Sequence, residues 1–476
     1  MTPTRRRALK VALFILSALS LLASPFALRA AGVGASYVAR ILATGVLVSG
    51  RSESAMWRED LESFGWVSAR VDGPARRVTA SVGPVTRVAS VVAGRGAIIE
   101  SDSEVQPSAA RASLTELAPL AEPGEAPWPV GDEGDSGPLP AGGDAARLQA
   151  AVSAAFAEPD PGSPLRTRAV LVVYRGRVVA ERYAPGVDAT MPLIGWSMTK
   201  SLVNALCGRA VERGLISLDA RPALSEWAGA QDPRRAVSLD VLLRMSSGLR
   251  FDESYGGAFS DCVRMLFGEP SAAVFAAAMP LEVEVDTRWS YASGSTNIIC
   301  LALARALGGP ERLVSFMRSE LFEPLGMRSA FVEQDSSGLI VGSSFGYGCA
   351  RDWARLGLLY LNDGRVAGRR LLPEGWVKAS VQPTAAAPQG RYGRHFWLNA
   401  GLDERGLNRP MPRIPRGAYF MRGYQGQSVS VLPSRELVVV RLGQTPRSNA
   451  FDLEGLLAEV MASLPAVGEG ATPGER

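Results

Sequence analysis

Two strand–turn–strand patterns lie at opposite ends of a long run of helical patterns, and this order limits the possible folds. Apolar strand residues flank a turn at 175–176 within residues 169–183, and the pattern recurs within residues 427–442 around a turn at 433–434. A final helix is predicted over 451–464. Strands at both ends of one domain, with helices between them, favour an antiparallel sheet closed by the chain ends. We therefore expect an α+β fold.

Composition divides the 476 residues into unequal parts. A Val-rich stretch with Gly breaks over 77–100 predicts short strands. A stretch rich in Pro, Gly and acidic residues predicts a linker or a surface crossover. The predicted parts are a signal peptide or membrane anchor (1–34), an N-terminal extension with short strands (35–117), the linker (118–143), a main domain (144–465) and a disordered tail (466–476).

The amino terminus carries a basic flank followed by an apolar run. Arg5, Arg6, Arg7 and Lys10 precede the uncharged segment Val11–Leu28. Such a pattern is typical of a signal peptide or a membrane anchor, and eighteen residues is at the lower end for crossing a bilayer. By the positive-inside rule the basic tail stays in the cytoplasm. The bulk of the chain is then exported, and it is membrane-anchored, periplasmic or extracellular.

Lysine is rare in this chain, which makes one lysine informative. Of 51 basic residues, only three are lysine: Lys10, Lys200 and Lys378. A buried lysine can release its proton near neutral pH, whereas arginine stays charged. Lys200 follows Ser197 by three residues, and the pair opens a helical pattern that ends at Gly214. Both side chains then share one face near the positive helix end, which predicts a serine nucleophile with a lysine base.

Six collinear segments resemble those of the serine β-lactamase and penicillin-binding-protein-like hydrolases, especially the esterases and amidases related to class C β-lactamases. The likeness covers roughly residues 145–465. The segments are IGWSMTK (194–200), LLRMSSGL (242–249), WSYASGSTN (289–297), LFEPLGM (321–327), RDWARLG (351–357) and GYQGQ (423–427). The resemblance implies a β-lactamase/transpeptidase-like fold, with an antiparallel sheet flanked by helices, an all-helical region, and the active site between them.

The resemblance also implies roles for two residues of the second motif. Tyr291 matches the tyrosine of the family's Tyr-x-Asn motif and would share the role of base with Lys200. For this role the Tyr291 hydroxyl needs a depressed pKa, which a neighbouring ammonium group can provide. Ser293 stands where the family usually has Asn. Because Ser is shorter, it would orient a substrate amide less directly.

The third motif lacks its usual cation. Tyr424–Gly426 stands where relatives carry Lys-Thr-Gly or His-x-Gly on a strand. In relatives the cation helps to hold the β-lactam carboxylate, so Tyr424 argues against β-lactamase activity. Whether Arg422 could reach the site depends on which face of its strand it occupies. The N–H groups of Ser197 and Gln427 would form the oxyanion hole, and Gly426 would allow close approach of a substrate.

Other chemistries find little support in the sequence. The only histidine, His395, has no supporting motif, so we expect a structural histidine rather than a Ser-His-Asp triad. The four cysteines form no CxxC pair, which favours buried side chains over a zinc site, although one disulfide stays open for an exported domain. Asp252 and Glu253 are interpreted as a solvated turn rather than an acid/base pair. We predict no metal, no cofactor and no nucleic-acid partner.

The preferred hypothesis is an exported or membrane-anchored serine hydrolase that cleaves a small ester or amide through an acyl-enzyme. One alternative is a β-lactamase or D,D-peptidase. Another is a non-catalytic hydrolase fold that acts as a binding or scaffold module. The residues with predicted roles are Ser197, Lys200 and Tyr291 in catalysis, and Gln427, Gly426, Ser293 and Tyr424 in binding the oxyanion or substrate.

Overall fold

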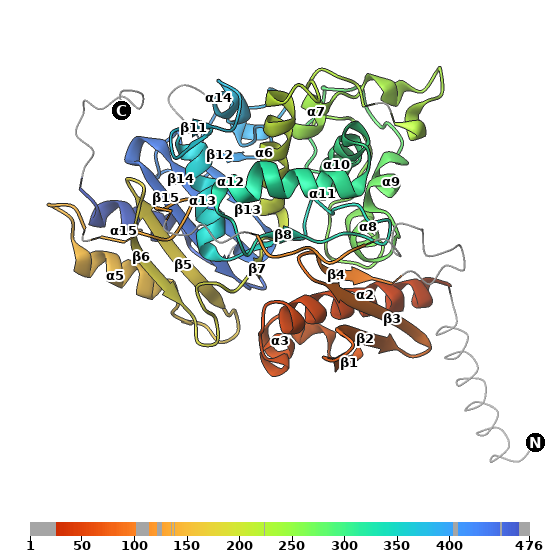
Figure 1. The fold of residues 1–476 in the computed structure, drawn as a ribbon, viewed down its shortest axis with the longest axis horizontal. Coiled ribbons are helices and arrows are strands. Elements are labelled where there is room, and N and C mark those ends of the chain that lie inside the picture. Colours follow the sequence, from red (N-terminus) through yellow and green to blue (C-terminus); the bar gives the residue numbers. More distant parts are fainter. Residues whose placement is uncertain are drawn as a thin grey trace, which may run out of the picture.

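The chain forms a main α+β body with an N-terminal unit (25–100) beside it, as Figure 1 shows. Residues 1–24 of the predicted signal peptide or anchor (1–34) and the predicted tail (466–476) lie outside the described residues, so the anchor and the tail stay predictions. The computed structural model describes residues 25–100, 114–120, 126–134, 136–137, 139–222, 224–402, 408–447 and 450–465.

A six-stranded antiparallel sheet is the centre of the main body, with the strand order β12–β13–β14–β15–β5–β6. Both predicted hairpins are present, as β5–β6 and β14–β15. Strand β15 pairs with β5, which confirms the sheet closed by the two ends of the domain. The strands are β5 Thr167–Tyr174, β6 Arg177–Tyr183, β12 Trp397–Leu398, β13 Tyr419–Arg422, β14 Ser428–Leu432 and β15 Leu437–Gly443.

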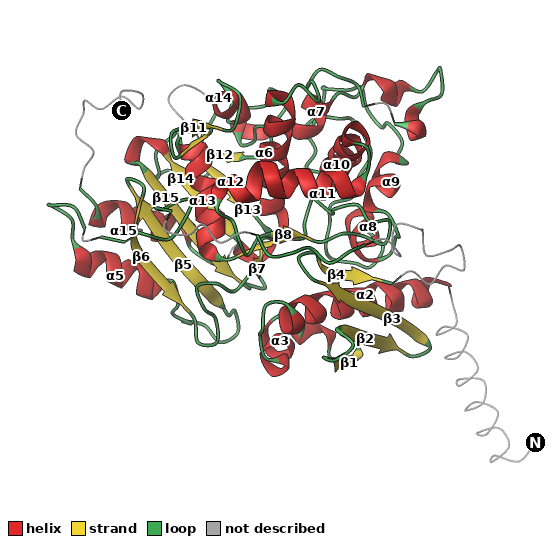
Figure 2. Ribbon diagram, viewed as in Figure 1, coloured by secondary structure: helices red, strands yellow, loops and turns green. Residues whose placement is uncertain are grey.

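Helices cover both faces of this sheet, as Figure 2 shows. Successive side chains of a strand point to opposite faces, so the buried strand β5 contributes to two layers of the core. Val172 packs in a cluster with α5 (Ala145–Ala154) and α15 (Leu453–Ser463). Leu171 belongs to the opposite cluster, which includes α13 (Ala350–Leu361). This two-layer burial explains why the central strands are almost continuously apolar.

The chain between β6 and β12 forms the helical region and two small sheets. A three-stranded sheet has the order β7–β9–β8, and β10 pairs with β11. These short strands are β7 Leu193–Ile194, β8 Phe331–Val332, β9 Gly346–Gly348, β10 Arg365–Val366 and β11 Arg369–Arg370. The helices are α6 Thr199–Glu212, α7 Leu239–Leu243, α8 Asp261–Phe267, α9 Ala272–Ala277, α10 Ser293–Leu307, α11 Pro310–Met317, α12 Glu323–Leu325 and α14 Trp376–Ser380.

The N-terminal unit is a four-stranded antiparallel sheet in sequence order, covered by the long helix α2. Within the described residues, α2 is the one helix long and apolar enough to cross a membrane, and 78% of its apolar window is buried inside the protein. The predicted boundary at residue 34 falls within this helix. The elements are α2 Pro25–Leu47, α3 Glu53–Glu59, β1 Ser68–Asp72, β2 Arg77–Val82, β3 Val85–Val92 and β4 Gly96–Ile99.

Buried polar groups join the N-terminal unit to the main body at Glu333, which follows β8. The Glu333 carboxylate accepts hydrogen bonds from the Thr44 hydroxyl of α2 and from the Ala97 N–H of β4, the latter at 3.0 Å. Arg40 of α2 lies 3.4 Å from the same carboxylate. Glu333 is fully buried. Burial raises the pKa of Glu333 to about 7, although the charge of Arg40 lowers it.

This raised pKa predicts a pH dependence of stability. Between the ordinary carboxyl range and pH 7, folded Glu333 holds a proton that the unfolded chain releases. The contribution of Glu333 is therefore complete at acidic pH and is lost as the pH rises to about 7. We expect Glu333→Gln to lose stability relative to wild type at pH 5 and to recover part of that loss by pH 8. The change is a few kcal/mol at most, since one pKa unit is about 1.4 kcal/mol. Urea unfolding of both proteins across this range measures it, and parallel stability curves would contradict it.

The Pro- and Gly-rich stretch crosses the surface of the main body. Arg355 of α13 donates to the carbonyl oxygens of Pro129 at 2.6 Å and Gly131 at 3.1 Å. Arg328 donates to the carbonyl oxygen of Val130 at 3.1 Å. The described part of the predicted linker is thus held against the body as a surface crossover.

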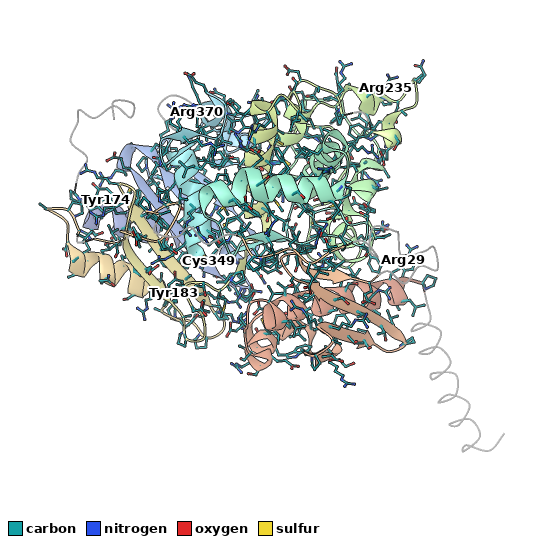
Figure 3. All side chains as sticks on the ribbon, in the orientation of Figure 1. Arg29, Tyr174, Tyr183, Arg235, Cys349 and Arg370 are labelled. Atoms are coloured by element: carbon teal, nitrogen blue, oxygen red, sulfur yellow. The ribbon has the colours of Figure 1, made fainter. Side chains whose placement is uncertain are left out.

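The four cysteines lie inside the folded protein. All are buried and unpaired, and burial raises the pKa of their thiols, which fits the predicted role as small core side chains. Figure 3 marks one of them, Cys349, among the packed side chains. The four residues are Cys207, Cys262, Cys300 and Cys349.

Candidate active site

Ser197 lies in a short 3-10 turn, Trp196–Met198, that leads directly into helix α6. The N–H of Gly195 donates to the carbonyl oxygen of Gly346 at 2.8 Å and holds the start of this turn. Trp196 has a φ of 48°, which is a strained conformation for a residue other than glycine and is often found at functional sites. Ser197 is partly exposed at the N-terminal end of α6, as the helical pattern predicts.

Lys200 is enclosed next to Ser197 and is only 1% exposed. Its Nζ lies 3.0 Å from Ser197 Oγ, 3.0 Å from Ser293 Oγ and 2.9 Å from the carbonyl oxygen of Ser343. It also lies 4.9 Å from the centre of the Tyr291 ring. The structure therefore brings the predicted nucleophile into hydrogen-bond contact with the predicted base, and these three oxygen atoms belong to uncharged groups.

Tyr291 lies in the same cluster and packs against other aromatic rings. Its ring centre lies 5.8 Å from that of Tyr392 and 5.3 Å from that of Trp397. Burial raises the pKa of Tyr291, and this effect outweighs the lowering by Lys200 and by hydrogen bonds with Ser197 and Lys200. The depressed pKa expected from the motif is therefore wrong. At neutral pH Tyr291 is a neutral phenol, which has a proton to donate.

Ser293 is fully buried, and its hydroxyl links Lys200 to a carboxylate. The Ser293 hydroxyl donates to Glu253 Oε1 at 2.6 Å, and its backbone N–H donates to Glu253 Oε2 at 2.7 Å. Burial raises the pKa of Glu253, while Lys200 lowers it. Asp252 is exposed, but Glu253 is part of the cluster, so the solvated-turn interpretation is wrong for Glu253. The expected contact of Ser293 with a substrate amide stays a prediction.

The third motif lies in a turn and not on a strand. Tyr424–Gly426 forms a 3-10 turn between β13 and β14, with φ of 60° at Gln425 and 82° at Gly426. The turn approaches the nucleophile segment so closely that a Cβ on Gly423 would lie 2.1 Å from the carbonyl oxygen of Gly195. The Tyr424 ring lies edge-on to Trp196, with 5.8 Å between the ring centres. The motif therefore lies beside the segment that carries Ser197.

Side chains from the sheet hold this turn in place. Arg441 of β15 donates to the carbonyl oxygens of Gly426 at 3.1 Å and Gln425 at 3.4 Å. The side chain of Gln427 exchanges two hydrogen bonds with the backbone of Gly443. The side chain of Gln427 thus supports the sheet, and the role of its backbone N–H as an oxyanion donor stays a prediction.

The position of Arg422 answers the question raised by the sequence. Its neighbour Met421 faces the core cluster that includes α6 and α13, whereas Phe420 faces the layer of α5 and α15. Arg422 follows Phe420 by two residues on β13 and so shares its face. Arg422 therefore does not replace the missing cation of the third motif.

Buried groups around Lys200 fix its backbone and its neighbours. His395 donates through Nδ1 to the carbonyl oxygen of Lys200 at 2.8 Å, and its Nε2 lies 3.1 Å from Thr296 Oγ1. Burial lowers the pKa of His395 to about 3, so the ring is neutral and its role is structural, as predicted. Asn297 accepts the N–H of Ser343 at 3.1 Å and so holds the segment whose carbonyl oxygen contacts Lys200.

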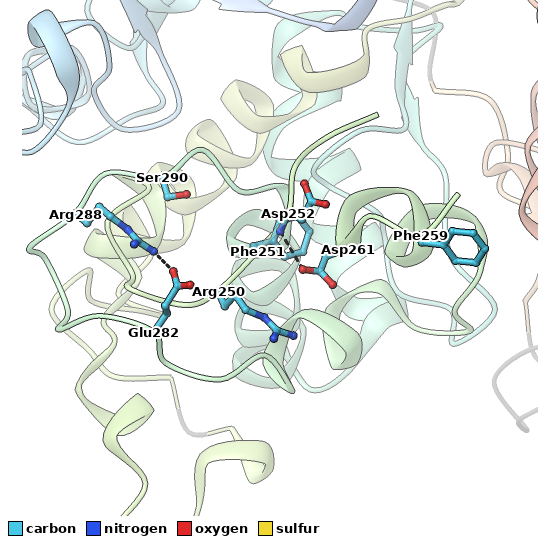
Figure 4. A pocket seen from close by; sticks show the side chains of 8 residues that line it. All are labelled: Arg250, Phe251, Asp252, Phe259, Asp261, Glu282, Arg288 and Ser290. Atoms are coloured by element: carbon cyan, nitrogen blue, oxygen red, sulfur yellow. Dashed lines mark hydrogen bonds and ion pairs between the residues drawn. The ribbon is translucent and has the colours of Figure 1, made fainter. Parts of the chain in front are cut away.

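A cavity of about 400 Å³ lies in the helical region, and Figure 4 shows the side chains that line it. Two of its lining residues, Asp252 and Ser290, immediately precede Glu253 and Tyr291 in the chain. Its walls carry charges of both signs, and Arg288 is paired with Glu282 across them. The lining residues are Arg250, Phe251, Asp252, Phe259, Asp261, Glu282, Arg288 and Ser290.

Sequence reasoning missed four residues of this site. Trp196, Ser343 and Arg441 act through backbone conformation or through contacts that no local motif marks. One feature of the sequence could have indicated Glu253. Ser293 stands where the family usually has Asn, so another group could replace the missing side-chain amide. That group lies 40 residues away in the chain, so spacing alone could not identify it.

Comparison with known proteins identifies the family. The family description Beta-lactamase matches residues 161–460. A curated relative, the 6-aminohexanoate-dimer hydrolase of Paenarthrobacter ureafaciens, is 26% identical over 331 residues, with 63% of this chain and 79% of that protein covered. The N-terminal unit lies outside the residues that the family description matches.

Solved structures agree on the fold. A putative beta-lactamase from Bacteroides dorei has a TM-score of 0.54 at 17% identity and covers 67% of this chain and 99% of its own. A family VIII carboxylesterase has a TM-score of 0.51 at 16% identity and covers 67% of this chain and 97% of its own. With the matched family covering most of the chain, the protein belongs to the beta-lactamase family of hydrolases and has its α+β fold.

Proposed function

We propose that this chain is a serine hydrolase that cleaves a carboxylic ester or amide through an acyl-enzyme on Ser197. One observation carries the proposal: the enclosed amine of Lys200 lies 3.0 Å from Ser197 Oγ. A neutral amine at this distance can accept the proton of the serine hydroxyl. Retention of this contact argues against a non-catalytic scaffold.

The proposed reaction uses three side chains and two backbone groups. Ser197 Oγ attacks the carbonyl carbon, and its proton passes to Lys200 Nζ as the new C–O bond forms. The N–H groups of Ser197 and Gln427 stabilise the oxyanion. The phenol of Tyr291 donates a proton to the leaving group as the scissile bond breaks, and Tyr291 regains a proton from Lys200. Water then attacks the acyl-enzyme with Lys200 as base, which releases the acid and restores Ser197.

A linear ester or amide suits this site better than a β-lactam. Tyr424 occupies the place of the cation that holds the β-lactam carboxylate in relatives, and Arg422 lies on the other face of its strand. By its name, the curated relative acts on a dimer of 6-aminohexanoate, and a structural neighbour is a carboxylesterase.

The proposal includes export of the hydrolase domain. The basic flank and the apolar segment Val11–Leu28 support either a signal peptide or a membrane anchor. Helix α2 passes the same length and composition test but packs inside the N-terminal unit, which makes it a core helix of the folded protein.

Turnover of three substrate classes tests the proposed function. We expect wild-type protein to hydrolyse a p-nitrophenyl ester or the linear 6-aminohexanoate dimer, and Ser197→Ala to retain none of that activity above background. Nitrocefin should be a poor substrate. Full turnover by Ser197→Ala would contradict the nucleophile, whereas rapid hydrolysis of nitrocefin would favour a β-lactamase instead.

A further inference from the structure

Glu253 is hydrogen-bonded to the catalytic cluster at Ser293. Both carboxylate oxygens are used: Oε1 accepts the Ser293 hydroxyl at 2.6 Å, and Oε2 accepts the Ser293 backbone N–H at 2.7 Å. Tyr255 adds a longer hydrogen bond to Oε1, at 3.4 Å. In its ionised form the Glu253 carboxylate can only accept hydrogen bonds, which matches the direction of both short contacts with Ser293. The proton of the Ser293 hydroxyl is therefore committed to Glu253.

The direction of this hydrogen bond determines whether the Ser293 hydroxyl donates to Lys200 or accepts from it. Since the only hydroxyl proton of Ser293 points at Glu253, its oxygen can only accept a hydrogen bond from the amine, which lies 3.0 Å away. The carbonyl oxygen of Ser343, 2.9 Å from the amine, can also only accept. A neutral amine has two N–H groups and one lone pair, and these two acceptors can occupy both N–H groups. The lone pair then faces the remaining side of the amine, where Ser197 Oγ lies 3.0 Å away and the Tyr291 hydroxyl hydrogen-bonds with both Ser197 and Lys200.

We propose that Glu253 is a positioning residue that fixes the hydroxyl proton of Ser293 and thereby aims the lone pair of Lys200 at Ser197. The inference rests on the proposed function, in which Lys200 is the base. It also explains the departure from Asn at position 293, because a hydroxyl can donate to a carboxylate and accept from an amine through one atom. An Asn side chain would face that carboxylate and that amine with a different set of donors and acceptors.

Glu253→Gln keeps both contacts with Ser293 but reverses the direction of the hydrogen bond with the Ser293 hydroxyl. The backbone N–H of Ser293 can only donate, so it pairs with the side-chain oxygen of the glutamine and not with its NH₂ group. The NH₂ group then faces the Ser293 hydroxyl and donates to it. The hydroxyl proton turns towards Lys200 and occupies the lone pair that Ser197 needs. Because Ser293 is the first residue of α10, the retained amide oxygen still caps the helix, and the fold is preserved.

Fluorophosphonate labelling of the full chain tests the inference. In this reaction Ser197 Oγ bonds to phosphorus, fluoride leaves, and the serine proton passes to Lys200. We expect Glu253→Gln to lower the maximal labelling rate about a hundredfold, as misorientation of a catalytic group can, with little change in the half-saturating probe concentration. Glu284→Gln is the matched control, since this exposed glutamate lies in the nearby loop before Tyr291 and should label like wild type.

A double-mutant cycle separates positioning through Ser293 from a general structural effect. In the Ser293→Ala background, Glu253→Gln should cost less than about threefold, because the hydroxyl that transmits its effect is gone. Thermal unfolding of each variant verifies that it is folded. An equal loss in both backgrounds, or wild-type labelling by Glu253→Gln, would overturn this inference alone. An unlabelled wild-type protein would overturn the proposed function and this inference with it.

Discussion

Replacing Lys200 with arginine is expected to lower kcat/KM for ester hydrolysis by about 10³-fold or more, although the positive charge and most of the length are kept. General acid–base catalysis typically contributes about 10²–10⁴-fold, and arginine cannot release its proton to act as the base. The site also has no room for a larger head group, because Lys200 is 1% exposed and its amine already contacts three oxygen atoms.

The chain offers a matched control for this substitution. Lys378 lies exposed on α14, so Lys378→Arg should leave both activity and stability unchanged. Steady-state kinetics on both variants, with thermal unfolding to verify the fold, gives the comparison. A Lys200→Arg protein with more than a tenth of wild-type activity would show that no proton needs to leave this position.

Replacing Arg441 with methionine is expected to produce the largest loss of stability. Arg441 is fully buried, its guanidinium lies 4.3 Å from the centre of the Phe451 ring, and its hydrogen-bond acceptors in the described part of the chain are neutral oxygen atoms. Burial lowers the pKa of Arg441 to about 9. Its guanidinium donates hydrogen bonds to the carbonyl oxygens of Leu165, Gln425 and Gly426 and to the hydroxyls of Thr167 and Thr445.

Methionine would remove the donor of these hydrogen bonds. The carbonyl oxygens of Leu165 and Gln425 keep a hydrogen bond from Thr445, whereas the carbonyl oxygen of Gly426 and the hydroxyl of Thr167 lose the one from Arg441. Each unsatisfied buried group costs about 1–3 kcal/mol, so we expect the free energy of unfolding to fall by about 2–6 kcal/mol. Activity should fall as well, even where the variant is still folded, because the left-handed turn at Gln425 and Gly426 loses its support beside Ser197. Urea unfolding and kcat measure the two effects. Arg221→Met, at an exposed position, is the control, and equal stability of the two variants would contradict this prediction.

The parts of the site that are close in sequence could be predicted. Ser197 and Lys200 are separated by one helical turn, so a helical pattern is enough to place them on one face. The two hairpins were predictable because their turns and apolar strands are local, and the closure of the sheet followed from their positions at the ends of the domain.

The remaining features depend on contacts between distant segments. The pKa of Tyr291 is raised because aromatic rings from a later part of the chain bury the phenol. A sequence motif does not show whether this burial or the charge of Lys200 has the larger effect on that pKa. The third motif forms a turn because Gln425 adopts a left-handed conformation that Arg441 supports from β15. The role of Glu253 depends on a loop that returns to the start of α10, so its own neighbours in the sequence gave no indication of it.

The most direct test of the account is the intact mass of the protein after treatment with a fluorophosphonate, beside Ser197→Ala and Lys200→Arg. We expect wild-type protein to gain one adduct, Ser197→Ala to gain none, and Lys200→Arg to react far more slowly than wild type. That result would establish an activated Ser197 that needs a deprotonatable lysine. A folded wild-type protein that gains no adduct would contradict the account and would favour a hydrolase fold that has lost its catalytic activity.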